Sequence, residues 1–119
     1  MEEYAARPSK YKRVDTVQAI PTFSHYAIQE LLERRVMKHL ISQNIDGLHR
    51  RSGVLKEEIS ELHGNTYLEK CYGCGADYVR DFRTRNPKNP YNVHLTGRHC
   101  DNCGDELCDT IVNFGESLP

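Results

Sequence analysis

Two Cys-x-x-Cys pairs constrain this 119-residue chain more than any other feature. Cys71 and Cys74 form the first pair, Cys100 and Cys103 form the second, and 25 residues separate the two pairs. A turn of this kind points both of its sulfurs at one place, so two turns supply four thiolates to a single tetrahedral zinc ion. Four protein ligands leave no position for a reacting water, and the predicted zinc is therefore structural.

The cysteines have alternative interpretations. A single Cys-x-x-Cys pair could be a redox motif, but a thioredoxin-like site needs one pair within a βαβ pattern, and chance spacing is the other alternative. His94 or His99 could replace one sulfur, although His99 adjoins Cys100 and its side chain would point elsewhere. Cys108 lies outside both pairs, and we interpret it as a buried thiol that acts as a small hydrophobic residue.

The charge balance and the hydrophobic content of the chain exclude several classes of protein. The chain has 16 Lys and Arg against 17 Asp and Glu, and this balance excludes a strongly basic protein that binds nucleic acid through bulk charge. No apolar run approaches the roughly 18 residues of a membrane span, and no secretory signal is visible. An intracellular, reducing setting is therefore expected, in which cysteines bind metals more often than they form disulfides. Only 38% of the residues are hydrophobic, so a metal is expected to reinforce a small core.

The first half of the chain predicts part of an α/β fold. Pro21 and Thr22 mark a helix start, and apolar residues at helical spacing follow. The short apolar run Val36–Ile41 is typical of a buried strand in a parallel sheet. The polar stretch Ser42–His49 then lies just past the carboxyl end of that strand, where open α/β sheets bind ligands. On its own, that stretch is better explained as a simple turn made by its Asn, Asp and Gly residues.

The second half predicts a zinc ribbon. A helical turn is expected over Leu55–Ile59, and strands are expected over Tyr67–Lys70, Ala76–Phe82, Gly97–Cys100 and Glu106–Phe114. Residues 83–96 contain two prolines and several asparagines, which favour a flexible loop. The basic residues near this loop are interpreted as a solvated face, or alternatively as a contact with an acidic partner; they are Arg80, Arg83, Arg85 and Lys88.

Several motifs together resemble the sirtuins, the NAD-dependent protein-lysine deacylases. They occur in the family's order and at similar separations, over about residues 21–119. Besides the cysteine pairs, they are Pro21-Thr22-Phe23-Ser24-His25, Ser42-Gln43-Asn44-Ile45-Asp46-Gly47-Leu48-His49, Arg51-Ser52-Gly53, Glu61-Leu62-His63-Gly64-Asn65 and Asn113-Phe114-Gly115-Glu116. The segments Leu62–Asn65 and Asp109–Glu116 are most similar to the class IV branch, which is related to nuclear and nucleolar members.

The resemblance implies a catalytic role for His63. It matches the family's catalytic base, which activates a ribose hydroxyl after the acyl oxygen of the modified lysine attacks the anomeric carbon and nicotinamide leaves. Histidine suits this task because its ordinary pKa of about 6.5 lets it accept a proton near neutral pH. Without the resemblance, His63 would be interpreted as a hydrogen-bonded residue at a strand end.

The resemblance also implies binding roles. Gln43, Asn44 and Asp46 match the NAD pocket, with Asn44 and Asp46 at the nicotinamide end and Gln43 against a ribose. The segment that pairs with the substrate peptide as an added strand is matched by Val112, Phe114, Gly115 and Glu116. The structural zinc ligands are matched by Cys71, Cys74, Cys100 and Cys103.

The implied fold class is α/β, an incomplete Rossmann-like parallel-sheet fragment plus a small zinc-ribbon module. The expected organisation is a lead-in segment over 1–20, a partial dinucleotide-binding region over 21–62, a zinc-binding module over 63–110 and a truncated substrate-binding strand segment over 111–119. Residues 1–20 lack the family's Gly-rich phosphate loop, so these 119 residues alone are expected to have weak activity or none.

The implied function is NAD-dependent removal of acetyl or other acyl groups from protein lysines, which gives nicotinamide and O-acyl-ADP-ribose. The expected cofactors are one structural zinc ion per chain and NAD as cosubstrate. The expected partner is an acyl-lysine protein or peptide, such as a histone tail, with no membrane and a nuclear location. Two other function classes stay open: a zinc-held module that binds without turnover, and nucleic-acid binding through the basic loop, which the balanced charge disfavours.

Overall fold

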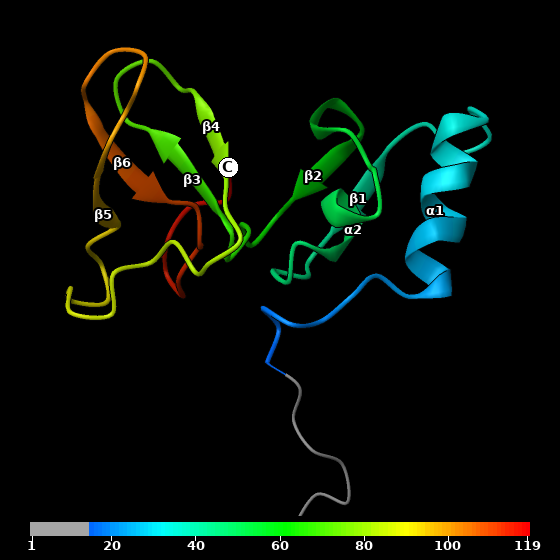
Figure 1. The fold of residues 1–119 in the computed structure, drawn as a ribbon, viewed down its shortest axis with the longest axis horizontal. Coiled ribbons are helices and arrows are strands. Elements are labelled where there is room, and N and C mark those ends of the chain that lie inside the picture. Colours follow the sequence, from blue (N-terminus) through cyan, green and yellow to red (C-terminus); the bar gives the residue numbers. More distant parts are fainter. Residues whose placement is uncertain (1–14) are drawn as a thin grey trace, which may run out of the picture.

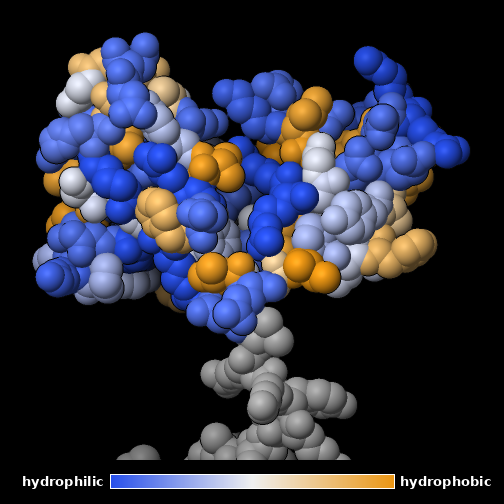
Figure 2. Space-filling model, viewed as in Figure 1, coloured by the Kyte–Doolittle hydropathy of each residue, from blue (hydrophilic) through white to orange (hydrophobic). Residues whose placement is uncertain are grey.

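The computed structural model describes residues 15–119, so most of the predicted lead-in over 1–20 lies outside the described residues. Two lobes lie side by side (Figure 1). One contains a two-stranded sheet and the helices, and the other contains a four-stranded sheet. Hydrophilic residues dominate the face shown in Figure 2, where hydrophobic residues form only small separate groups. Within residues 15–119, no helix combines the length and the apolar character needed to cross a bilayer.

The first helix begins where the sequence predicts. Helix α1 spans Phe23–Glu33, and Thr22 is its N-cap residue. The backbone N–H of Thr22 donates to Nδ1 of His25 at 3.1 Å, and its carbonyl accepts the N–H of Tyr26 at 3.2 Å. The first bond satisfies an N–H group that a helix start leaves without a partner, and the second is the first regular hydrogen bond of the helix. The inner face of α1 packs into a small apolar core made of Leu32, Val54 and Ile59, with Ile28, Met37 and Leu40 against it.

The parallel pair of strands brings two loops to one edge. Strand β1 (Leu40–Ser42) pairs in parallel with β2 (Ile59–Glu61), and Ser42 lies opposite Glu61. Between them run helix α2 (Leu48–Arg51) and the short 3-10 helix η1 (Lys56–Glu58). Because parallel strands end at the same edge, the loop after β1 and the loop after β2 emerge together.

Two expectations for this lobe are wrong in detail. The strand expected over Val36–Ile41 begins only at Leu40, because the backbone N–H of Met37 still bonds the carbonyl of Leu31 and holds the chain against the end of α1. Ile41 is also 67% exposed rather than buried. The helical turn expected through Ile59 ends at Glu58, and Ile59 starts a strand that the sequence analysis does not predict.

The second lobe is an antiparallel ribbon. Its strands are β3 (Leu68–Cys71), β4 (Asp77–Val79), β5 (Leu95–His99) and β6 (Glu106–Asp109), in the order β4-β3-β6-β5. All four predicted strands are present, with different bounds. Strands β4 and β6 are shorter than predicted and end at Val79 and Asp109, β3 is shifted by one residue, and β5 begins at Leu95, inside the region expected to be a loop. Residues 111–116 form no strand in the described structure.

A buried carboxylate in this lobe accepts hydrogen bonds from two arginines. Glu69 on β3 is fully buried, and its carboxylate accepts from Nε of Arg80 at 2.7 Å and from Nε of Arg98 at 2.9 Å. Burial raises the pKa of Glu69, but the hydrogen bonds from Arg98 and Arg80 outweigh it and lower that pKa overall. Arg85 in turn donates to Oδ1 of Asn113 at 3.0 Å. The interpretation of Arg80 and Arg85 as a solvated face is therefore wrong.

One close backbone approach joins the two lobes. The N–H of Asn65 donates to Oγ1 of Thr110 at 3.1 Å, and the Thr110 hydroxyl donates to the carbonyl of Asn65, also at 3.1 Å. Gly64 has a φ of +80°, and a Cβ placed on it would lie 1.9 Å from the carbonyl oxygen of Thr110. Only glycine fits here, both for its left-handed backbone and for the contact itself.

We predict that Gly64→Ala destabilises the protein more than Gly97→Ala does. Both glycines have a positive φ, but a Cβ on Gly97 would meet nothing within 4 Å. Gly97→Ala should cost about 1–2 kcal/mol of backbone strain, and Gly64→Ala should cost about 1–3 kcal/mol more because of the clash. Denaturant unfolding of the zinc-saturated variants measures both values. Equal costs would contradict the close approach of the lobes.

Candidate metal centre and histidine pocket

Two turns of the same geometry carry the cysteine pairs. In the first, the N–H of Gly75 donates to the carbonyl of Cys71 at 3.1 Å; in the second, the N–H of Gly104 donates to the carbonyl of Cys100 at 2.8 Å. The glycines have φ values of +74° and +79°, so each turn closes in the left-handed region that glycine adopts without strain. The pair spacing and the glycine after each pair thus fix the local structure, as the sequence predicts.

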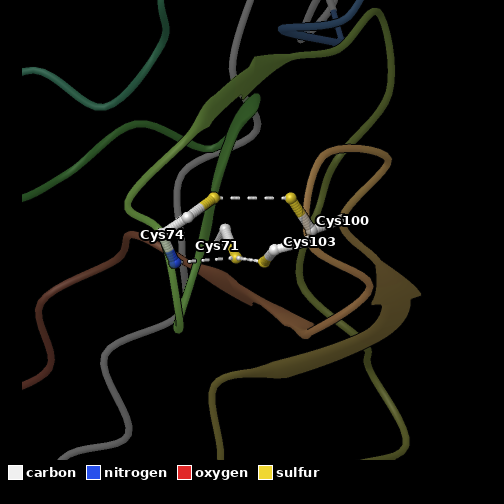
Figure 3. Close-up of side chains that lie close together, drawn as sticks. All are labelled: Cys71, Cys74, Cys100 and Cys103. Atoms are coloured by element: carbon white, nitrogen blue, oxygen red, sulfur yellow. Dashed lines mark hydrogen bonds between the residues drawn. The ribbon is translucent and has the colours of Figure 1, made fainter.

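The two turns bring their four sulfurs together (Figure 3). One candidate ligand atom from each of Cys71, Cys74, Cys100 and Cys103 lies within 4.8 Å of the others. Sγ of Cys71 is 3.4 Å from Sγ of Cys103, and Sγ of Cys74 is 3.6 Å from Sγ of Cys100. Neither His94 nor His99 belongs to this cluster within residues 15–119, so the alternative with a histidine ligand is not favoured.

The donor set fits zinc. A tetrahedral zinc with bonds of about 2.3 Å separates its sulfur ligands by about 3.8 Å, close to the two observed sulfur–sulfur distances. All four donors are thiols, which bind zinc as thiolates and fill its coordination shell. Zinc bound here would cross-link the two turns. It would leave no open coordination position for a substrate.

A tyrosine supports one of the sulfurs from outside the cluster. The hydroxyl of Tyr78 lies 3.1 Å from Sγ of Cys100 and accepts the backbone N–H of Asp101 at 3.0 Å. Because that N–H occupies an acceptor site, the hydroxyl proton is free to point at the sulfur. The Tyr78 hydrogen bond lowers the pKa of Cys100 to about 6, which favours the metal-binding thiolate at neutral pH. The Arg80 guanidinium lies 4.9 Å from the centre of the Tyr78 ring and makes a cation–π contact with it.

A cavity of about 410 Å³ brings together the predicted catalytic and substrate-binding residues. His63 follows β2 and is exposed on the wall of this cavity. The other predicted residues on its wall are Val112, Phe114, Gly115 and Glu116. The N–H of Val112 donates to the carbonyl of His63 at 3.1 Å, so the two segments lie directly beside each other.

The residues predicted for NAD lie on the neighbouring loop. Gln43, Asn44 and Asp46 follow β1, and none of the three is among the described residues that line the His63 cavity. Oδ1 of Asp46 accepts the N–H of Leu48 at 3.0 Å and thereby satisfies the first N–H of α2. The N–H of Thr66 donates to the carbonyl of Ile45 at 2.9 Å, which ties this loop to the one that carries His63.

Tyr91 is a cavity residue that the sequence analysis missed. It lies in the region 83–96 that was expected to be a flexible loop, and its hydroxyl accepts the N–H of Phe114 at 3.2 Å. Its carbonyl accepts from Nδ2 of Asn113 at 2.9 Å. The only signal in the sequence was an aromatic residue directly after Pro90 and before Asn92. Such a residue does not reveal contacts more than twenty positions away.

We predict that Tyr78→Phe weakens zinc binding about 10–100-fold, the usual effect of losing a hydrogen bond to a metal ligand. Tyr72→Phe is the matched control, since it removes a hydroxyl from the first cysteine turn but its residue is 82% exposed. Competition with a chromophoric zinc chelator measures both affinities. Equal affinities for the two variants would show that the Tyr78 hydroxyl does not support the metal site.

Curated relatives resemble most of this chain. Mouse sirtuin-7, an NAD-dependent protein deacetylase, is 48% identical over 104 residues, which are 86% of this chain and 26% of the relative. The NAD-dependent protein deacetylase SRT1 of Arabidopsis thaliana is 41% identical over 86% of this chain and 21% of its own length. The chain thus spans about a quarter of the length of the curated relatives that it matches.

Solved structures and a family model agree with these relatives. A Sir2 homologue in complex with NAD has a TM-score of 0.57 and 34% identity over 87% of this chain and 37% of that one. A Sir2 protein bound to an acetylated peptide has a TM-score of 0.54 and 29% identity over 87% and 41%. The predicted fold class, a Rossmann-like parallel-sheet fragment with a zinc-type module, is confirmed. Because the Sir2 family model matches residues 3–119, the chain belongs to the Sir2 family, with sirtuin-7-like, class IV character.

Proposed function

We propose that this chain carries the catalytic-base and peptide-binding part of an NAD-dependent protein-lysine deacylase. The observation that carries the proposal is the single cavity that His63 shares with all four predicted substrate-binding residues. These residues come from segments about fifty positions apart in the sequence, and the contact between His63 and Val112 holds them together. The names of the relatives, all of them NAD-dependent protein deacetylases, support the same reaction class.

In the proposed reaction, His63 accepts a proton from a ribose hydroxyl of NAD. This step follows an earlier one, in which the acyl oxygen of the modified lysine attacks the anomeric carbon of the nicotinamide ribose, the bond from that carbon to nicotinamide breaks, and nicotinamide leaves. The deprotonated hydroxyl then attacks the acyl carbon, the bond from that carbon to the lysine nitrogen breaks, and the lysine amine leaves with a proton, which gives O-acyl-ADP-ribose. Exposure of His63 on the cavity wall would let both substrates reach it. An imidazole is suited to this step because it accepts a proton near neutral pH.

The neighbouring loop is proposed to hold the nicotinamide half of NAD. Asn44 and Asp46 would bind the carboxamide, and Gln43 would contact a ribose. The support is positional: this loop and the loop with His63 emerge from adjacent parallel strands at one edge of the sheet. The bond from Leu48 already occupies one carboxylate oxygen of Asp46, and the other oxygen has no hydrogen-bond partner among residues 15–119.

The segment 111–116 is proposed to bind the acyl-lysine peptide through its backbone. It forms no strand within the described chain, and Phe114 is fully exposed beside the cavity. An extended peptide that adds to such a segment gains affinity from main-chain hydrogen bonds and leaves side-chain choice loose. Solved relatives bound to acetylated and propionylated peptides support an acyl-lysine ligand. A histone tail as that ligand and a nuclear location are finer proposals, which rest on the similarity to sirtuin-7.

We predict that His63→Ala slows formation of O-acyl-ADP-ribose at least about 100-fold, since a positioned general base contributes about 10²–10⁴ to the rate. The measurement is a single-turnover assay, with the protein in excess over labelled NAD and an acetyl-lysine peptide present. This design detects slow conversion as well as fast conversion.

His39→Ala is the control, because His39 is an exposed histidine that bonds Ser60 and does not line the His63 cavity within the described chain. Its rate should match that of the unmodified protein. Peptide binding without any nicotinamide release would instead favour a binding module. A rate that survives His63→Ala would remove His63 from the chemistry.

A further inference from the structure

His94 connects the zinc lobe to the cavity that contains His63. It precedes β5, and its two ring nitrogens face two different carboxylates. Nδ1 lies 2.9 Å from Oδ1 of Asp109, and Nε2 lies 3.0 Å from Oε1 of Glu116. Asp109 ends strand β6 of the zinc lobe, whereas Glu116 belongs to the segment that lines the cavity.

The two contacts together require a charged imidazole. A neutral imidazole carries one N–H, so it can donate to only one partner, and its other nitrogen would meet an oxygen lone pair. An ionised carboxylate only accepts hydrogen bonds. Two carboxylates within 3.0 Å of the two nitrogens are therefore both satisfied only by the imidazolium form, which has two donors.

The burial of Asp109 strengthens this requirement. Its side chain is fully buried, while the side chain of His94 is 26% exposed. Oδ1 of Asp109 also accepts the backbone N–H of Ile111 at 3.1 Å, but Oδ2 has no hydrogen-bond partner among residues 15–119. A buried carboxylate with one unpartnered oxygen is stabilised by a neighbouring cation, and the imidazolium form of His94 would supply that cation.

Glu116 connects His94 to the turn that lines the His63 cavity. Its Oε2 accepts the backbone N–H of Asn113 at 2.8 Å, and its Oε1 accepts from Nδ2 of Asn113 at 3.0 Å. The N–H of Glu116 in turn donates to the carbonyl of Asn113 at 3.1 Å. The turn Asn113–Glu116 is thus closed by its own bonds and attached to the zinc lobe through His94.

We propose that His94 is a positioning residue, whose imidazolium holds the turn Asn113–Glu116 in the shape that forms the acyl-peptide side of the His63 cavity. The inference rests on the proposed function, because it assigns His94 to the peptide-binding segment of the same site. His94 does not line the His63 cavity within residues 15–119, so its effect passes through Glu116.

Other polar groups near His94 do not replace either carboxylate. Tyr72, Glu106 and Cys108 line a shallow cavity with it on the β6 side. On the opposite side, Nδ2 of Asn113 lies 3.4 Å from Nε2, and Arg85 reaches the site only by bonding Oδ1 of Asn113. Glu106 adds a third carboxylate to these surroundings, and Arg85 adds a positive charge that is already hydrogen-bonded to Asn113.

The contact should weaken as pH rises. The hydrogen bond to Asp109, followed by that to Glu116, raises the pKa of His94 above its ordinary 6.5. Stabilisation by the imidazolium is therefore complete below pH 6.5 and is lost as pH rises through the raised pKa. Glu116 stays ionised throughout, because its bonds to the backbone and side chain of Asn113, and then to His94, lower its pKa to about 2. The surface contact to Glu116, rather than the buried one to Asp109, should break first.

Amide hydrogen exchange of the zinc-loaded 119-residue chain tests the contact without any substrate. The observable is the protection factor of the Asn113 and Glu116 amides, because a protection factor is already corrected for the intrinsic pH dependence of exchange. We expect both protection factors to fall roughly tenfold as His94 deprotonates, which is the effect of losing one charge-assisted hydrogen bond. In His94→Gln, the same factors should be low and independent of pH. Flat protection in the unmodified protein, or a pH dependence that persists in His94→Gln, would overturn the proposal.

Two further measurements separate this proposal from the proposed function. In Glu116→Gln, the His94 pKa followed by NMR should fall, because one of its two charged partners is lost; an unchanged pKa would overturn the contact.

Affinity for an acetyl-lysine peptide should decrease with rising pH in the unmodified protein and should be constant in His94→Gln. If the exchange results hold but peptide affinity ignores pH, His94 does not position the peptide site. If no acyl-lysine peptide binds at any pH, the proposed function fails while the exchange result still decides the contact.

Discussion

The zinc lobe has a small hydrophobic interior, which includes two of its own metal ligands. Its buried cluster consists of Cys71, Cys100 and Leu107, with Ala76 and Tyr78 packed against it. A core of this size cannot offset the conformational entropy of four strands and two tight turns. Four sulfurs held this close would repel one another as thiolates if no cation joined them. Metal binding and folding of this lobe are therefore one process, as in other small zinc domains.

The lobe that zinc holds together also fixes the cavity around His63. The Asn65–Thr110 bonds and the close approach at Gly64 attach the end of β6 to the loop that follows β2. Two residues further on, Val112 bonds His63 directly. A structural metal thereby acts on the site at a distance, by setting the path of residues 109–116, and needs no contact with substrate. The parallel strands β1 and β2 provide the other half of the arrangement, because their shared edge places the two loops together.

Local features were predictable from sequence, and long-range partners were not. The cysteine spacing and its glycines determine each turn within a few residues, and Thr22 determines the start of α1, so both predictions are confirmed. The start of β1 was misplaced because the contact that delays it, from Met37 back to Leu31, depends on how α1 ends. Arg80 was interpreted as part of a solvated face because charge alone does not show that its partner Glu69 is buried. The roles of His63, Gln43, Asn44 and Asp46 remain predictions of the family resemblance.

X-ray absorption at the zinc edge, combined with metal analysis of the purified chain, tests the central claim most directly. The claim is that Cys71, Cys74, Cys100 and Cys103 bind one zinc ion, on which the ribbon and the adjoining cavity depend. The account predicts one zinc per folded chain, with about four sulfur neighbours at about 2.3 Å and no nitrogen or oxygen ligand. A well-folded chain without stoichiometric zinc, or a zinc ion with water or histidine in its shell, would contradict it.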